Sequence, residues 1–222
     1  MDITLKWKLA QAKELRWWSK YLKKKDKSDY LHWKKNYWHE LLDGIRKDIF
    51  LNNGHDVLDA GCGPAGIFIV LDNYKVDAED PLLDQYDEKL DHFKKADYPR
   101  VTFYSVALEN FDPQKKYQCV FSMNAINHVS DMIAAFDKLV ELTKDNGYVI
   151  ISIDAHNYNF FKYLLRLIPA DVLHPHQHDL KEYENMLISR NCALINSKLV
   201  KEEFFFNHYL LIARKKPKLI GS

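Results

Sequence analysis

The chain has 222 residues, 47% of them hydrophobic, and a net charge of +1, so it can bury one good core. No apolar run reaches the length of about 18 residues that a membrane span needs, and residues 1–10 lack a signal-peptide core. The three cysteines are far apart and form no CxxC pair, which argues against a disulfide framework and against a cysteine zinc site. We therefore expect a soluble, cytoplasmic protein.

The first fifty residues are predicted to be helical, because apolar residues recur at spacings of three and four within 5–15 and 31–49. We expect residues 1–50 to be a helical extension or lid and residues 51–222 to be the main domain. The extension also holds the tryptophans of the chain. Their packing onto the main domain is the plainer interpretation, and an aromatic lid over a pocket is the alternative. All five lie in this extension: Trp7, Trp17, Trp18, Trp33 and Trp38.

The extension is also basic. Residues 1–50 carry 13 lysines and arginines against 7 acidic residues, whereas residues 51–222 carry 19 against 24. A positively charged N-terminal extension could bind an anionic substrate or a nucleic acid, but basic residues more often form the solvated side of an amphipathic helix. RNA binding by these helices stays open as an alternative, with nucleic acid the less expected partner.

From residue 56 onward, short apolar runs alternate with helical segments. The predicted strands lie near 56–60, 75–80, 101–106, 117–123 and 147–153, and the predicted helices near 64–72, 82–95 and 131–143. Asp179 and Glu182 have the spacing of a capping box for a helix that ends near Arg190, and strand-like runs follow at 193–200 and 204–213. The pattern predicts an α/β fold, with a Rossmann-like, seven-stranded, mostly parallel sheet covered by helices on both faces.

A glycine-rich turn follows the first predicted strand. Residues 57–66 read Val-Leu-Asp-Ala-Gly-Cys-Gly-Pro-Ala-Gly, and glycines let the backbone approach a ligand closely. The next predicted strand ends at Asp80, 19 residues after Gly61, where a carboxylate is placed to accept the hydroxyls of a ribose. Together the two features predict a crevice for a nucleoside.

The same glycines fit the dinucleotide fingerprint of a nicotinamide or flavin oxidoreductase. Asp59 argues against it, because its charge would repel a pyrophosphate but suits the ammonium and sulfonium of S-adenosylmethionine. No second mononucleotide-binding half is evident either. The dinucleotide-dependent oxidoreductase is therefore the less favoured alternative.

Several segments resemble the class I S-adenosylmethionine-dependent methyltransferases that act on small molecules. Residues 58–63 resemble the first motif of that family, and Asp80 its ribose acid. Residues 117–124 resemble its fourth strand, although Gln118 stands where an aspartate is common. Residues 127–131 resemble a Glu-His-Val segment of many members. The resemblance implies S-adenosyl-L-methionine as the cofactor.

The resemblance also implies roles for individual residues. Asp59 would face the amino group of the cofactor, Asp80 its ribose and Leu82 its adenine. Members of the family often have an aspartate that binds the adenine amino group. This sequence lacks that aspartate, and Glu109 is the candidate substitute. The remaining implied cofactor contacts are Gly61, Cys62, Gly63, Ala107, Leu108 and Asn124.

Methyl transfer from a sulfonium is an in-line displacement, so the protein aligns donor and acceptor and removes a proton from a hydroxyl or an amine. We expect the acceptor at the C-terminal edge of the sheet, under a cap formed by residues 155–178. Candidate bases or positioning residues there are His128, Asp154, His174 and His176, since imidazole titrates near neutral pH. For the histidines, loop packing or capping is the plainer interpretation. No carboxylate partner for a metal is fixed, so we predict no metal and a small-molecule O- or N-methyltransferase whose acceptor the sequence leaves open.

Overall fold

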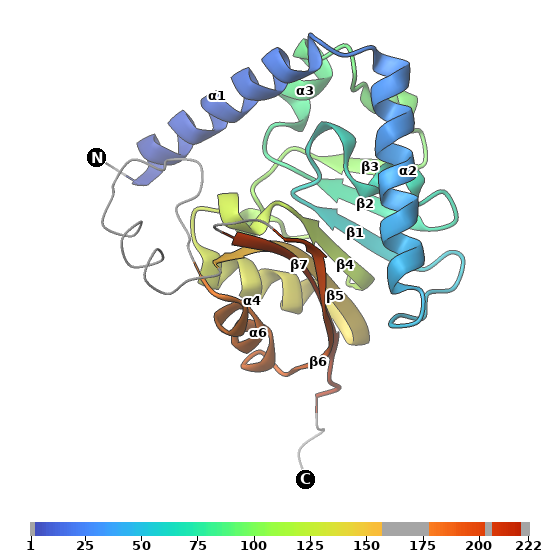
Figure 1. Ribbon diagram of the computed structural model, residues 1–222, viewed down its shortest axis with the longest axis vertical. Coiled ribbons are helices and arrows are strands. Elements are labelled where there is room, and N and C mark those ends of the chain that lie inside the picture. Colours follow the sequence, from blue (N-terminus) through green and yellow to red (C-terminus); the bar gives the residue numbers. More distant parts are fainter. Residues whose placement is uncertain (1–2, 157–177, 203–205, 219–222) are drawn as a thin grey trace.

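The computed structural model describes residues 3–156, 178–202 and 206–218. Two long helices open the chain, α1 (Ile3–Leu22) and α2 (Lys27–Ile45), and they meet at a sharp corner (Figure 1). Asp26 caps α2, because its side chain accepts a hydrogen bond from the backbone N–H of Asp29. The predicted helical extension is present. Among the described residues, no helix combines the length and the apolar character that a membrane crossing requires.

The sheet has seven strands in the order β3-β2-β1-β4-β5-β7-β6. The first five strands in this order are parallel to one another, while β7 runs antiparallel to both β5 and β6. This order confirms the predicted Rossmann-like, mostly parallel sheet. The strands are β1 (Asp56–Ala60), β2 (Lys75–Glu79), β3 (Val101–Tyr104), β4 (Tyr117–Met123), β5 (Thr143–His156), β6 (Cys192–Lys201) and β7 (Phe206–Lys215).

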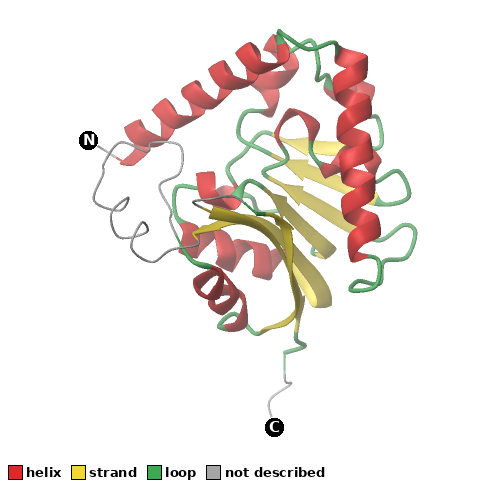
Figure 2. Cartoon of the chain, viewed as in Figure 1, coloured by secondary structure: helices red, strands yellow, loops and turns green. Residues whose placement is uncertain are grey.

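The sheet separates two apolar clusters, and helices cover both of its faces (Figure 2). Val57 belongs to the cluster beneath α2 and α3 (Leu83–Lys89), whereas its neighbour Leu58 faces α4 (Met132–Leu142) and α6 (Leu180–Ile188). This alternation is the period of two expected of a strand. The strand order reverses between β1 and β4, so the fold places a crevice at their carboxyl ends.

The predicted helix at 64–72 is wrong. Two short 3-10 helices, Gly63–Ala65 and Ile67–Val70, occupy this stretch. Gly66 between them is extended, with φ −69° and ψ −177°, so helical hydrogen bonding cannot continue through it. A Cβ atom at Gly66 would lie 2.3 Å from Asp59 Oδ2, so the chain wraps tightly around this carboxylate.

The helix predicted at 82–95 is also shorter than expected. It ends at Lys89, because Leu90 takes an extended conformation with φ −108° and ψ 126°. At α6 the predicted capping box is present, since Asp179 accepts from the Glu182 N–H and the Glu182 side chain accepts from the Asp179 N–H.

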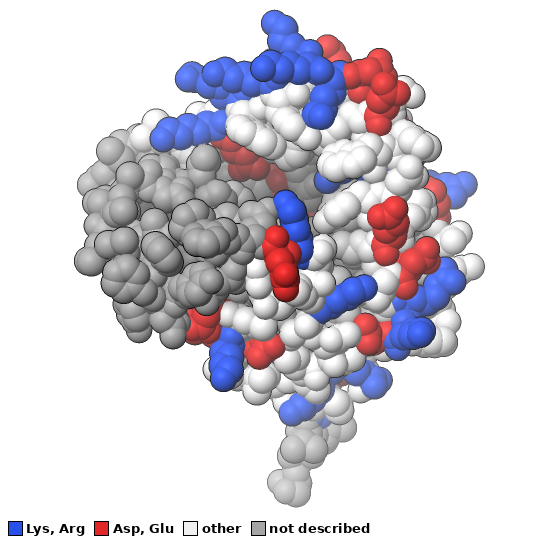
Figure 3. Space-filling view, viewed as in Figure 1, with Lys and Arg blue, Asp and Glu red and all other residues white. Residues whose placement is uncertain are grey.

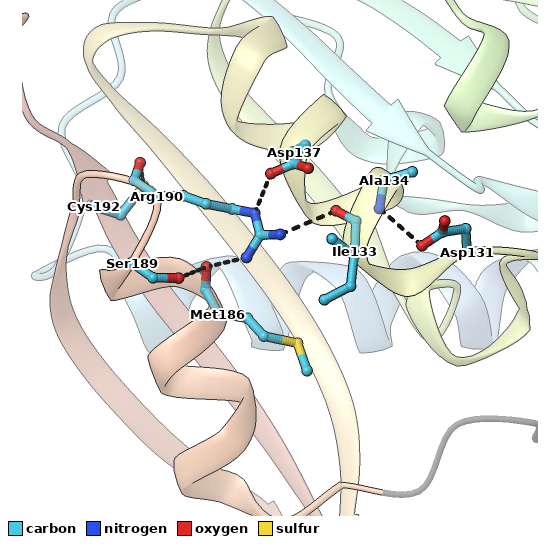
Figure 4. Close-up of polar contacts among 8 residues, drawn as sticks. All are labelled: Asp131, Ile133, Ala134, Asp137, Met186, Ser189, Arg190 and Cys192. Carbon is cyan, nitrogen blue, oxygen red and sulfur yellow. Dashed lines mark hydrogen bonds and ion pairs between the residues drawn. The ribbon is translucent and has the colours of Figure 1, made fainter.

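Arg190 joins α6 to α4 (Figure 4). Its Nε lies 2.6 Å from a carboxylate oxygen of Asp137, and its Nη2 donates to the backbone oxygen of Ile133. Its Nη1 donates to the backbone oxygen of Met186, one of the last carbonyls of α6. These contacts hold the two helices together on one face of the sheet.

Candidate functional site

A cavity of about 560 Å³ lies at the carboxyl ends of the central strands. Residues from the ends of β1, β2, β4 and β5 line it, and both N-terminal helices contribute side chains. Figure 3 shows basic side chains along the outside of α1, with acidic atoms beneath them. The helical extension supplies Trp7, Gln11, Glu14, Trp17, Trp18, Lys34 and Trp38 to the lining.

The glycine turn, residues 61–63 after β1, is hydrogen-bonded to the last residue of β2. The backbone N–H groups of Gly61 and Cys62 donate to the carbonyl oxygen of Glu79 at 2.8 and 3.0 Å. Gly61 has φ +67°, and a Cβ atom there would lie 2.3 Å from Cβ of Ala125. Both observations require glycine at this position, since an L side chain disfavours a positive φ.

Asp80 follows β2 and binds the turn directly. Its Oδ2 accepts from the N–H of Gly63 at 3.0 Å, and its Oδ1 accepts from the N–H of Leu82 at 2.8 Å. Burial raises the pKa of Asp80 to about 7, and the negative charge of Glu14 adds to this effect. The carboxylate is thus held in a fixed orientation, and each oxygen keeps acceptor capacity for a ligand.

Three fully buried polar side chains in the lining each have an atom without a hydrogen-bond partner among the described residues. They are Asp59 Oδ1, Glu79 Oε1 and Ser122 Oγ. Asp59 Oδ2, by contrast, accepts from the N–H of Phe68 at 3.0 Å, and burial raises the pKa of Asp59 to about 7. An unsatisfied buried polar atom costs about 1–3 kcal/mol, so three in one cavity indicate a polar ligand.

Lys34 brings a positive charge into the same cavity from α2. Its ammonium lies 4.5 Å from the ring centroid of Trp38 and 5.4 Å from that of Tyr37. Burial lowers the pKa of Lys34 to about 8, while the charge of Asp59 opposes this shift. Among the described residues that line the cavity, no other is a lysine or an arginine. This position of Lys34 could not be predicted from the sequence, because Lys34 and Lys35 together look like part of a solvated basic face.

Asp154 and His208 lie together in the lining of the cavity. Asp154 Oδ1 is 2.7 Å from His208 Nδ1, across the paired strands β5 and β7. Asn124, which has φ 56°, donates its N–H to Ser152 Oγ, and Ser152 Oγ donates to Asn124 Oδ1. Sequence reasoning missed His208, since nothing local indicates that it would meet Asp154.

The structure brings most of the predicted site residues to this cavity. Leu82 does not line it, because its side chain is buried in the apolar cluster beneath α2 and α3, and the neighbouring Pro81 lines the cavity instead. His174, His176 and residues 157–177 of the predicted cap lie outside the described residues. The predicted residues in the lining are Asp59, Gly61, Cys62, Gly63, Asp80, Ala107, Leu108, Asn124, His128 and Asp154, together with the substitute Glu109.

Comparison with curated proteins finds two methyltransferases. The ubiquinone biosynthesis O-methyltransferase of Rhodopseudomonas palustris is 27% identical over 134 residues, which cover 55% of this chain and 52% of that protein. The malonyl-[acyl-carrier protein] O-methyltransferase 1 of Ilyobacter polytropus is 29% identical over 106 residues, which cover 44% of this chain and 37% of that protein. The chain therefore spans about half, or less, of the length of these relatives.

Among solved structures, the magnesium protoporphyrin IX methyltransferase of Synechocystis with bound S-adenosylmethionine has the same fold. The TM-score is 0.56 at 17% sequence identity, over 82% of this chain and 79% of that chain. A family model described as a methyltransferase domain matches residues 30–201. Because this match covers more than half of the chain, the protein belongs to the methyltransferase-domain family.

Proposed function

We propose that the protein transfers a methyl group from S-adenosyl-L-methionine to an oxygen or nitrogen atom of a small molecule. The observation that carries the proposal is the carboxylate of Asp80, held at the β2 tip by the glycine turn, in a cavity with unsatisfied buried polar atoms. A carboxylate in this position accepts the hydroxyls of a ribose.

The charges of the lining suit the methionine end of this cofactor. Asp59 Oδ1, which has no partner among the described residues, would accept a hydrogen bond from the ammonium, and Lys34 would pair with the carboxylate. Six acidic side chains face the cavity against one lysine, which disfavours a pyrophosphate and hence the dinucleotide alternative. These acids are Glu14, Asp59, Glu79, Asp80, Glu109 and Asp154.

When bound, the cofactor supplies an activated methyl group on a positively charged sulfur. The chain has to align the acceptor and take up its proton. Asp154 engages His208 at Nδ1, which leaves Nε2 as the ring nitrogen that accepts a proton from a hydroxyl or an amine. His128 lines the same cavity and is a second candidate for orienting the acceptor.

The lining from α1 supports a small, partly apolar acceptor. Trp7 and Trp18 offer flat apolar surface to the cavity, whereas Lys8, Lys13 and Lys20 of the same helix are exposed. A phosphate backbone is bound by basic side chains, and α1 does not direct these three into the cavity. This arrangement favours a small molecule over RNA as the acceptor.

Isothermal titration with S-adenosylhomocysteine, NADH and FAD tests the cofactor. We expect S-adenosylhomocysteine to bind with one site per chain, and neither dinucleotide to bind. The acceptor follows from incubating the protein with methyl-labelled S-adenosylmethionine and fractionated small molecules, because only the true acceptor takes up the label. Binding of NADH or FAD in place of S-adenosylhomocysteine would overturn the proposal.

A further inference from the structure

We propose that Glu14 of α1 is the second arm of a ribose clamp. Its carboxylate accepts a hydrogen bond from one of the two neighbouring ribose hydroxyls, and the carboxylate of Asp80 accepts a hydrogen bond from the other. The inference rests on the proposed function and extends its cofactor site to a helix that precedes residue 30, where the family match begins. The family match therefore assigns nothing to Glu14.

One face of α1 points to the cavity. Trp7, Gln11, Glu14 and Trp18 all line it, and they follow one another at spacings of four, three and four residues. Residues at these spacings share one side of a helix. Lys13, the neighbour of Glu14 in the chain, is exposed on another side of the helix. The orientation of the whole helix therefore directs Glu14 toward the cavity.

The position of Glu14 is fixed by α3. The hydroxyl of Tyr86, which is fully buried, donates to Glu14 Oε1 at 3.2 Å. Tyr86 lies on the short helix that begins just after Asp80, so this hydrogen bond brings the α1 carboxylate to the β2 tip. Trp18 reaches the glycine turn, since a Cβ atom at Gly63 would lie 3.8 Å from its ring.

The two carboxylates act on each other. The negative charge of Glu14 disfavours ionisation of Asp80, and both charges disfavour ionisation of the Tyr86 hydroxyl. Two like charges facing one cavity call for a ligand that supplies donors, and a vicinal diol offers two O–H groups without adding negative charge. The unpartnered oxygens of Asp59 and Glu79 in the same lining independently indicate a donor-rich ligand.

A divalent cation is the other ligand that two carboxylates could hold. Among the described residues, no group of three or more histidine, cysteine, aspartate or glutamate side chains is placed to bind a metal ion. The diol therefore fits the pair better than a cation does.

Calorimetric titration of the full chain tests the clamp, with S-adenosylhomocysteine and its 2′-deoxy and 3′-deoxy analogues as ligands. Glu14→Gln keeps an oxygen for the Tyr86 hydroxyl but loses the charge. We expect this substitution to weaken the binding of S-adenosylhomocysteine about tenfold. For the deoxy analogue that lacks the hydroxyl contacted by Glu14, the affinity should fall by less than about twofold. The matched control is Glu40→Gln, at an exposed position of α2, which should bind like the wild type.

The outcomes separate the two proposals. If the wild type binds S-adenosylhomocysteine and Glu14→Gln binds it equally well, the clamp is overturned and the proposed function stands. An equal loss for all three ligands also overturns it, because Glu14 then contacts neither hydroxyl. No binding by the wild type overturns both proposals. Should Glu14→Gln fail to fold, Tyr86→Phe removes the hydrogen bond that positions Glu14 and must show the same dependence on the analogue.

Discussion

Asp154 and His208 lie directly opposite each other on the antiparallel strands β5 and β7, with 2.7 Å between Oδ1 and Nδ1. Both side chains line the cavity. A carboxylate at Nδ1 fixes the orientation of the imidazole and presents Nε2 as the reactive nitrogen. The hairpin of β6 and β7, which completes the sheet, thereby places an oriented imidazole at the edge where the parallel strands end.

His208→Gln is expected to slow methyl transfer to the identified acceptor by about 10² to 10⁴-fold, because the proton acceptor is lost. Its affinity for S-adenosylhomocysteine should stay within about twofold of the wild type, since the cofactor residues are untouched. Initial rates and titration calorimetry measure the two quantities. The matched control is His39→Gln at an exposed position of α2. An unchanged kcat would remove His208 from the chemistry.

Asp80→Asn is expected to weaken S-adenosylhomocysteine binding by about 1–3 kcal/mol, because the hydrogen bonds from the ribose lose their charged acceptor. Titration calorimetry gives the difference directly. Asp72→Asn replaces an exposed aspartate and serves as the control. Equal affinities of Asp80→Asn and wild type would mean that the ribose lies elsewhere.

Asp59 should make the unliganded protein less stable as the pH rises. Its pKa in the folded chain is about 7, above the ordinary value of 3.8, so its contribution to stability is fully present below about pH 4 and is lost as the pH rises through about 7. Asp59→Asn removes this loss. We expect the unfolding free energy of the variant, measured relative to the wild type, to be about 2 kcal/mol higher at about pH 8 than at about pH 5. Its affinity for the cofactor should fall.

Urea unfolding at several pH values measures the stability of both proteins. If the difference in unfolding free energy between Asp59→Asn and wild type does not change with pH, the carboxylate is not destabilised by its burial. A gain in stability together with a loss of affinity would identify Asp59 as a residue kept for binding.

Gly61→Ala and Gly54→Ala form a matched pair. Both glycines have a positive φ, but a Cβ atom at Gly54 meets nothing within 4 Å, whereas one at Gly61 would lie 2.3 Å from Ala125 Cβ. Gly54→Ala should therefore cost about 1–2 kcal/mol of backbone strain, and Gly61→Ala about 1–3 kcal/mol more through overpacking. Denaturant unfolding compares the two, and equal losses would contradict the close approach at Gly61.

The central sheet could be predicted because its signals are local. The apolar runs at 56–60 and 117–123 coincide with β1 and β4, and the glycines with Asp80 marked the crevice. The segment after the first strand was harder, since a helical pattern there does not reveal that Gly66 must stay extended around Asp59. Buried polar groups of this kind are set by tertiary packing.

The rest of the cavity depends on contacts between distant parts of the chain. An amphipathic pattern shows which face of α1 or α2 is polar, but not that Glu14 and Lys34 turn into a cavity formed by later strands. The partner of Asp154 depends on the register of β7 against β5, which places His208 opposite it. Cross-strand register is a non-local property, so local sequence patterns did not reveal this pair.

A crystal structure of the complex with S-adenosylhomocysteine would show whether the cavity at the carboxyl ends of the strands is the cofactor site. We expect the ribose hydroxyls within hydrogen-bonding distance of Asp80, the amino group beside Asp59, and the sulfur directed toward the edge that carries His208. If S-adenosylhomocysteine instead binds outside this cavity, the cavity is not the cofactor site and the proposed methyl transfer at this edge is wrong.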